Sequence, residues 1–196
     1  MWDLRYGAEE YVYGTLPNDF LVSRVSALPR GRVLCLGEGE GRNAVWLAGH
    51  GFEVHAVDSS AVGLEKARRL ARERGVSLET TVADLALFET GAGAWDAIVS
   101  IFCHLPPAVR SRVHGRIVHW LRPGGVFLLE AYTPGQLALA TGGPPTVELM
   151  MTLAGLRREL EGLVIEHGVE TVRAVTEGRL HHGDGAVVQV LARRPA

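Results

Sequence analysis

Short, almost continuously apolar runs alternate with amphipathic segments along most of this chain. Five of these runs are predicted to be strands, at residues 33–36, 53–57, 78–82, 97–101 and 126–129. Strands in a parallel sheet that is covered by helices on both faces have this apolar character. The alternation therefore predicts an α/β fold, a doubly wound and mostly parallel sheet with helices on both faces.

Two of the intervening segments carry clear helix boundaries. Ser60 is a predicted N-cap of a helix that ends before Gly75. A second helix follows Pro106-Pro107 and ends at Pro123-Gly124-Gly125. A shorter helix is predicted over residues 44–50, and another begins near Asn18 or Asp19.

The end of the chain departs from this alternation. Residues 163–175 and 186–193 are strand-like, and the connection between them is rich in glycine. It is too short for a helical crossover, so the two strands are expected to pair antiparallel. The sheet should therefore have seven strands and a C-terminal antiparallel hairpin.

Length and charge exclude several classes of partner. The 196 residues fit a single domain, 1–196, and the net charge of −2 gives no positive field for nucleic acid or an anionic membrane. No apolar run reaches the ~20 residues of a membrane span. Cys35 and Cys103 lie in or beside apolar strands, so we expect reduced, buried thiols in a cytoplasmic protein. The sequence does not determine the oligomeric state.

The first predicted strand runs into three alternating glycines, Gly37-x-Gly39-x-Gly41, before a helix. Such a loop turns sharply and lets its main chain approach a ligand at the carboxyl edge of the sheet. The next strand ends in Asp58, where a carboxylate can accept hydrogen bonds from the hydroxyls of a ribose. The alternative role of Asp58 is a helix N-cap, in competition with Ser59 and Ser60.

The loop differs from that of a dinucleotide-binding protein. The fingerprint position that needs glycine or alanine is occupied by Arg42. Glu38 and Glu40 would repel a pyrophosphate but suit a cation such as a sulfonium or an ammonium group. No Gly-Lys-Ser/Thr follows, which excludes a P-loop. The pattern favours S-adenosylmethionine (SAM) over NAD.

The chain resembles the class I SAM-dependent methyltransferases over nearly its whole length. The glycine loop, Asp58, Ala83-Asp84-Leu85, the strand at 95–99 and Leu121-Arg122-Pro123-Gly124-Gly125 match the family's motifs in order. The narrower resemblance is to small bacterial proteins of the tellurite-resistance and thiopurine-methyltransferase type. The resemblance implies SAM as cofactor, S-adenosylhomocysteine (SAH) as product, Asp58 on the ribose and Asp84 on the adenine. The implied cofactor-binding set is Gly37, Glu38, Gly39, Gly41, Asn43, Asp58, Ser59, Ala83, Asp84, Leu85, Ser100 and Phe102, with Tyr13 and Asn18 from the N-terminal segment.

One position departs from the family pattern. The acidic residue that usually stands two positions before the first glycine is replaced by Cys35. In the family this carboxylate helps to hold the amino acid end of SAM. We hypothesise that Glu38 supplies the missing negative charge from within the loop.

The fourth strand continues into Ser100-Ile101-Phe102-Cys103-His104-Leu105, where the transferable methyl group should lie. Two residues are candidate catalytic groups. His104 is expected either to orient or deprotonate an acceptor, or to satisfy the polar groups of its loop. Tyr132 is expected to point its phenol toward the site. The signature of the amino-methyltransferases in the family that this chain resembles, Asn/Asp-Pro-Pro-Tyr/Phe, is absent, which argues against methylation of adenine or glutamine nitrogens.

Three further segments bear on the site. Residues 1–30 should cover the cofactor and the acceptor, and residues 131–151 have the length and composition of a lid. His181, His182 and Asp184 suggest a metal site, but neighbours on an extended chain point in opposite directions, so a solvated turn is favoured. No metal is expected.

The sequence therefore predicts a SAM-dependent methyltransferase with a small-molecule acceptor at sulfur, a heavier chalcogen, nitrogen or oxygen. Two alternatives stay open: a nicotinamide-dependent oxidoreductase and a SAM-binding protein without catalysis.

Overall fold

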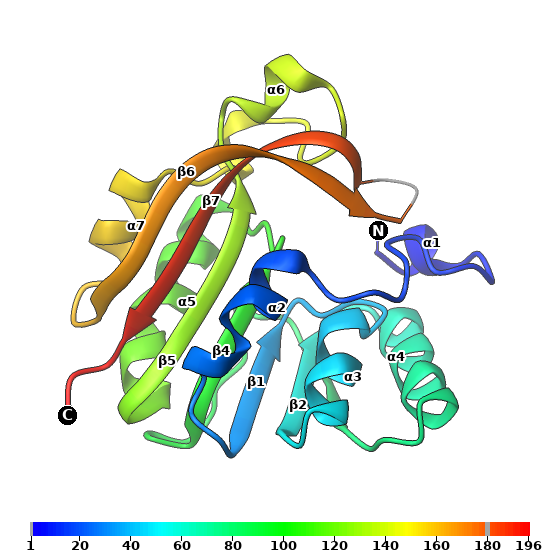
Figure 1. The fold of residues 1–196 in the computed structure, drawn as a ribbon, viewed down its shortest axis with the longest axis horizontal. Coiled ribbons are helices and arrows are strands. Elements are labelled where there is room, and N and C mark those ends of the chain that lie inside the picture. The colour runs from blue at the N-terminus through cyan, green and yellow to red at the C-terminus, as the bar shows by residue number, and fades with distance from the viewer. Residues whose placement is uncertain (1, 179–180) are drawn as a thin grey trace.

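The computed structural model describes residues 2–178 and 181–196, and in this part seven strands form one sheet in the order β3-β2-β1-β4-β5-β7-β6 (Figure 1). Every neighbouring pair from β3 to β5 is parallel, and β7 pairs antiparallel with both β5 and β6. The strands are β1 (Arg32–Leu36), β2 (Glu53–Asp58), β3 (Glu79–Val82), β4 (Trp95–Ile101), β5 (Leu121–Tyr132), β6 (Val164–Glu177) and β7 (His181–Arg193). The predicted fold class is confirmed.

Seven α-helices and two short 3-10 helices connect these strands in the described part of the chain. They are α1 (Trp2–Tyr6), α2 (Asp19–Arg24), η1 (Val25–Ala27), α3 (Arg42–Gly49), α4 (Ala61–Glu73), α5 (Pro107–Trp120), α6 (Gln136–Leu139), η2 (Val147–Leu149) and α7 (Leu153–Glu159). The predicted caps are confirmed, because the Ser60 side chain accepts from the N–H of Gly63 and the Asn18 side chain from that of Leu21. The helix predicted over 44–50 begins two residues earlier, at Arg42.

Successive residues of β1 pack on opposite faces of the sheet, as the period of a strand requires. Leu34 belongs to a buried cluster with side chains of α5 and α7. Val33 and Cys35 belong to a second cluster with side chains of α2, α3 and α4. The sheet is thus buried on both faces, which explains why its inner strands are apolar without alternation.

The C-terminal hairpin is longer than predicted. Pairing of β6 with β7 continues through Val175–Gly183 and Glu177–His181, so both strands extend well into the connection expected between them. Of the predicted turn, Arg179 and Leu180 lie outside the described residues. The exposed His182 and Asp184 lie in β7, so the prediction of a solvated turn is wrong for them. The glycines did not stop the strand, because Gly183 and Gly185 stay paired with Val175 and Arg173 of β6.

The parallel strands all point their carboxyl ends toward one edge of the sheet, and α1 and α6 lie beyond this edge (Figure 1). Helix α1 comes from the N-terminal segment, and α6 belongs to the segment that follows β5. Segments far apart in the sequence therefore meet above the strand ends. Within residues 2–178 and 181–196, no helix has the length and apolarity required to cross a membrane.

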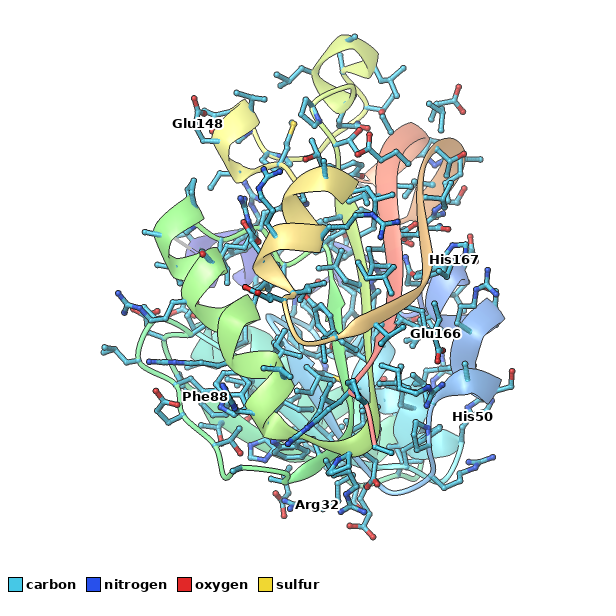
Figure 2. All side chains as sticks on the ribbon, turned by 90° about the vertical axis from the view of Figure 1, so that its left-hand side faces the viewer. Arg32, His50, Phe88, Glu148, Glu166 and His167 are labelled. Atoms are coloured by element: carbon cyan, nitrogen blue, oxygen red, sulfur yellow. The ribbon has the colours of Figure 1, made fainter. Side chains whose placement is uncertain are left out.

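The hairpin also contacts α2, which lies on the face of the sheet away from α5 and α7. Figure 2 shows α5 and α7 in front of the sheet, with His167 of β6 at its side. The ring of His167 lies 5.6 Å from that of Phe20 on α2, and its Nδ1 lies 3.2 Å from Nη2 of Arg24. These contacts hold α2, and with it the N-terminal segment, against the hairpin.

Candidate cofactor and acceptor site

The loop between β1 and α3 forms the floor of the candidate site. Gly37, Gly39 and Gly41 all have positive φ, at 61°, 61° and 91°. A Cβ at Gly37 would lie 2.5 Å from Sγ of Cys103, and one at Gly41 would lie 2.5 Å from Cβ of Ala67. Backbone conformation and close packing therefore both require glycine at these two positions.

Glu38 lies in the glycine loop before α3, and its carboxylate lies at the N-terminus of that helix. Its Oε1 accepts hydrogen bonds from the N–H groups of Asn43 and Ala44, at 2.9 and 2.8 Å. Burial raises the pKa of Glu38 to about 7, against the lowering effect of these bonds. Burial raises the pKa of the Cys35 thiol, and the neighbouring Glu38 raises it further through its charge. The carboxylate beside Cys35 is thus one whose pKa lies near neutral pH.

Asp58 joins the end of β2 to the glycine loop. Its Oδ2 accepts the N–H of Gly39 and its Oδ1 that of Ser60, both at 2.8 Å. Asp58 therefore bonds the N-cap residue of α4, but the capping side chain is that of Ser60. Burial raises the pKa of Asp58, and the main-chain bonds oppose this effect. The N–H of Ser59 is a third main-chain donor to this carboxylate, which keeps part of its acceptor capacity for a ribose hydroxyl.

The third strand brings Asp84 and Leu85 to the same edge. The N–H of Ala83 donates to the main-chain oxygen of Asp58, which holds the two strand ends together. Oδ1 of the exposed Asp84 accepts the N–H of Ala86 at 2.8 Å, and Leu85 is buried beside it. An acidic side chain and an apolar one thus flank the cavity where β3 ends.

The residues beyond β4 form an aromatic group. Phe102 has φ of 50°, a strained value for a residue with a side chain, and its N–H donates to Glu130 O of β5. Its ring stacks on that of Tyr132 at 4.6 Å, and the Tyr132 and His104 rings lie 5.7 Å apart and nearly parallel. Tyr132 is fully buried, and burial raises the pKa of its phenol.

The N-terminal segment is held over the glycine loop by Glu40, whose carboxylate is engaged by partners within the protein. Oε1 of Glu40 lies 2.6 Å from Nζ of Lys66, and both side chains are buried. Oε2 of Glu40 accepts the N–H of Tyr13, and Lys66 also donates to the main-chain oxygen of Glu10. The charge of Glu40 is therefore neutralised within the protein, and the expectation that it suits a ligand cation loses its support. That Lys66 is the only lysine was the one sequence signal for this pair.

A second buried ionic group lies behind the loop. Arg42, the residue at the fingerprint position, pairs with Glu177 of β6 at 2.5 Å. Arg173 pairs with both Glu177 and Glu130, at 3.2 and 2.6 Å. The Nδ2 of Asn18 donates to Glu130 and Glu177, at 2.5 and 2.8 Å. This group ties α3, β5, β6 and the N-terminal segment together, and no local sequence pattern indicates it.

A cavity of about 510 Å³ opens where these elements meet. Its volume is in the range of small-molecule sites. The residues that line it are Trp2, Arg5, Tyr6, Tyr13, Gly14, Gly37, Glu38, Glu40, Arg42, Asn43, Asp58, Ser59, Asp84, Leu85, Ile101, Phe102, Cys103, His104, Leu105, Gly142, Gly143, Pro144, Pro145 and Leu149.

Most of the sequence-predicted site residues lie on this cavity, which unites the glycine loop, the ends of β2, β3 and β4, and residues of both covering segments. The predicted residues outside its lining are Gly39, Gly41, Ala83, Ser100, Asn18 and Tyr132. The two glycines still shape the loop, and Tyr132 lies against Phe102. Trp2, Arg5 and Tyr6 of α1 also line the cavity, and the sequence had indicated them only as part of the covering segment 1–30. Among the described residues, no group of three metal-binding side chains is present.

The residues on this cavity fit a nucleoside that carries a cation. The Asp58 carboxylate suits ribose hydroxyls, as described above, and Glu38 offers a carboxylate on the floor. Arg42 is held by Glu177 and by the main-chain oxygen of Leu16. A dinucleotide-binding loop needs a small residue at this position, and here the large Arg42 side chain is fixed in its place.

Residues 33–125 match a family model described as a methyltransferase domain. A curated relative, the 2-heptyl-1-hydroxyquinolin-4(1H)-one methyltransferase of Mycobacteroides abscessus, is 27% identical over 159 residues. That alignment covers 79% of this chain and 66% of the relative, so the chain spans just under two thirds of the relative's length.

Solved structures with a similar fold cover nearly the whole chain. One, from work on the conversion of a disulfide bond into a thioacetal group during echinomycin biosynthesis, has a TM-score of 0.80 at 22% identity, over 97% of this chain and 86% of its own. TehB from Haemophilus influenzae has a TM-score of 0.73 at 17% identity, over 98% of this chain and 65% of its own. The [4+2]-cyclase SpnF has a TM-score of 0.73 at 19% identity, over 100% of this chain and 93% of its own. At these identities the likeness establishes the Rossmann-like fold. The fold agrees with the methyltransferase-domain match over residues 33–125.

Proposed function

We propose that this chain is a SAM-dependent methyltransferase that transfers a methyl group to a small-molecule nucleophile. The observation that carries the proposal is the convergence of Glu38, Asp58 and Asp84 on one cavity at the carboxyl edge of the sheet. Ligands of open α/β sheets bind at this edge, beside the point where the strand order reverses. That point lies here between β1 and β4.

Each carboxylate has a role in this proposal. Asp58 accepts hydrogen bonds from the ribose, and Asp84 reads the adenine amino group with Leu85 and Ser59 beside the base. Glu38 faces the amino acid end, where its negative charge replaces the one missing at Cys35. SAM, when bound, supplies the electrophilic methyl group. The chain's own contribution is to align the acceptor and to exclude water.

The acceptor compartment is bounded by Phe102, His104 and two covering segments. We assign residues 1–30 as the cofactor-covering segment and 131–151 as the lid of a single domain that extends over 1–196. Tyr13 and residues 142–145 bring these segments onto the cavity. The relative that methylates a hydroxyquinolone supports a small organic acceptor, and the likeness to TehB supports the tellurite-resistance branch.

The fold alone does not specify methyl transfer, since a cyclase shares it. The test is therefore a thermal-shift titration with SAM, SAH and NAD, followed by an acceptor panel assayed for labelled methyl product. The panel contains thiols, selenite, tellurite, amines, phenols and N-hydroxyquinolones. Stabilisation by SAM and SAH with transfer to one class is the expected result. Stabilisation by NAD alone would support the oxidoreductase, and tight SAM binding without turnover would support a non-catalytic SAM-binding protein.

A further inference from the structure

His104 uses both ring nitrogens for hydrogen bonds to the main chain. Its Nδ1 lies 3.0 Å from the carbonyl oxygen of Leu149, and its Nε2 accepts the N–H of Tyr132 at 3.4 Å. A carbonyl oxygen only accepts and an amide N–H only donates, so Nδ1 carries the proton and Nε2 the lone pair. The contacts thus select the neutral Nδ1–H tautomer.

The two partners of His104 lie at opposite ends of one segment. Tyr132 is the last residue of β5, and Leu149 ends the 3-10 helix η2. The carbonyl oxygen of Tyr132 also accepts the N–H of Met151 at 2.9 Å, which closes the base of the segment. Residues 142–145 and Leu149 line the cavity from this segment. One imidazole therefore bridges the start and the end of a loop that walls the cavity.

This arrangement differs from that of a general base. A base must direct a ring nitrogen with a lone pair at the proton that it removes. The Nε2 lone pair of His104 is directed instead at a main-chain N–H, and the ring is held by its stacking near Tyr132 and Phe102.

We propose that His104 is a positioning residue that latches the 131–151 lid, through Tyr132 N–H and Leu149 C=O, and so sets the acceptor side of the cavity. This inference rests on the proposed function, because it takes that segment as the wall of the acceptor compartment. A nucleophilic acceptor in this site is aligned by a closed lid, and His104 does not take its proton.

The first test reads the tautomer directly. In ¹⁵N-labelled protein at pH 8, the two ring nitrogens of His104 have distinct chemical shifts for N–H and for a lone-pair nitrogen. The expected result is the Nδ1–H tautomer with Nε2 unprotonated. The Nε2–H tautomer would overturn the latch, because it places a hydrogen between Nε2 and the Tyr132 N–H. This measurement needs neither a variant nor an acceptor.

The second test removes the two bonds separately. His104→Asn keeps a donor near the Nδ1 position for Leu149, and His104→Gln places an oxygen near Nε2 for Tyr132. His104→Phe keeps a stacked ring and loses both bonds. His119→Gln, on the exposed end of α5, is the control for a histidine substitution elsewhere.

Hydrogen exchange of residues 133–149 is the first measurement on these variants, with and without SAH. Exchange should be fastest in His104→Phe, by about tenfold over the wild type, as the loss of one or two net hydrogen bonds implies. It should be intermediate in His104→Asn and His104→Gln and unchanged in His119→Gln. Unchanged exchange in a folded His104→Phe protein would overturn the latch.

Kinetics with the acceptor found in the panel separate the latch from a base. A latch predicts a raised acceptor KM with a smaller change in kcat, partly restored in His104→Gln. A base predicts a loss of kcat in all three variants with exchange unchanged, which would overturn the proposal. If SAH fails to bind the wild type, the proposed function is lost, and the tautomer and the exchange data still decide the latch.

Discussion

The carboxylate of Asp58 accepts the main-chain N–H of Gly39 at 2.8 Å, so the end of β2 holds the glycine loop that follows β1. One side chain thereby shapes the floor of the cavity and offers its remaining lone pairs to a ligand. The glycine loop and the Asp58 carboxylate are therefore linked, and separate substitutions at Asp58 and Gly41 measure what each contributes to ligand binding.

Asp58→Asn should weaken SAH binding by about 10- to 100-fold, measured by calorimetry. The amide keeps an oxygen for one main-chain N–H but loses the charge that strengthens hydrogen bonds from hydroxyls, worth about 1.5–3 kcal/mol. Glu73→Gln, at the exposed end of α4, is the matched control and should bind SAH normally. Affinity within twofold of the wild type for Asp58→Asn would contradict ribose binding by this residue.

Glu38 should make SAM binding depend on pH. Its pKa is raised to about 7 from an ordinary value of 4.5, chiefly by burial, and a bound cation favours the ionised form. SAM affinity should therefore rise as pH increases through 7, with release of a proton on binding below that pH. Calorimetry in two buffers of different ionisation enthalpy measures this release. In Glu38→Gln, SAM should bind more weakly and without the pH dependence, and unchanged affinity would remove Glu38 from the site.

The same residue should affect the stability of the ligand-free protein in the opposite direction. A carboxyl whose pKa is raised on folding stabilises the fold below its unfolded pKa, and this contribution is lost as pH rises through the folded pKa. The stability of the wild type relative to Glu38→Gln should thus fall between pH 4.5 and 7. Urea denaturation at pH 5, 6 and 7.5 measures it. A wild type that gains stability relative to the variant over this range would be inconsistent with the raised pKa.

The Glu40–Lys66 pair should be strongly coupled. Lys66→Met leaves the buried Glu40 carboxylate without its ion pair and should lower the free energy of unfolding by about 3–5 kcal/mol. Glu40→Gln in the same chain removes that charge and should recover much of the loss. A double-mutant cycle measures the coupling. A cost below about 1 kcal/mol for Lys66→Met alone would show that the pair does not hold the N-terminal segment.

Gly41→Ala and Gly75→Ala should separate packing from backbone strain. Both glycines have positive φ, at 91° and 67°. A Cβ at Gly41 would lie 2.5 Å from Ala67, and one at Gly75 would meet nothing within 4 Å. Gly75→Ala should therefore cost about 1–2 kcal/mol from conformation alone. Gly41→Ala should cost clearly more and should weaken SAH binding. Equal costs in denaturation experiments would mean that the loop relaxes away from α4.

The fold was predictable because its signals are local. Continuous apolar runs identify strands that are buried on both faces, and Ser60 and Asn18 are caps that follow from the chemistry of their own side chains. The hairpin was predicted in type but not in length. Glycines at 183 and 185 resemble a turn in sequence, whereas in the structure both are paired with β6.

The sequence by itself determined the seven strands, the helices α2, α3, α4 and α5, the glycine loop and the carboxylate of Asp58, because each depends on neighbours a few residues away. Only the tertiary structure decided which charges face the cavity. Glu40 is neutralised by Lys66 and Arg42 by Glu177, and these partners lie 26 and 135 residues away. It also placed the His104 ring between Tyr132 and Leu149, since hydrogen-bond partners are set by folding and not by position in the chain.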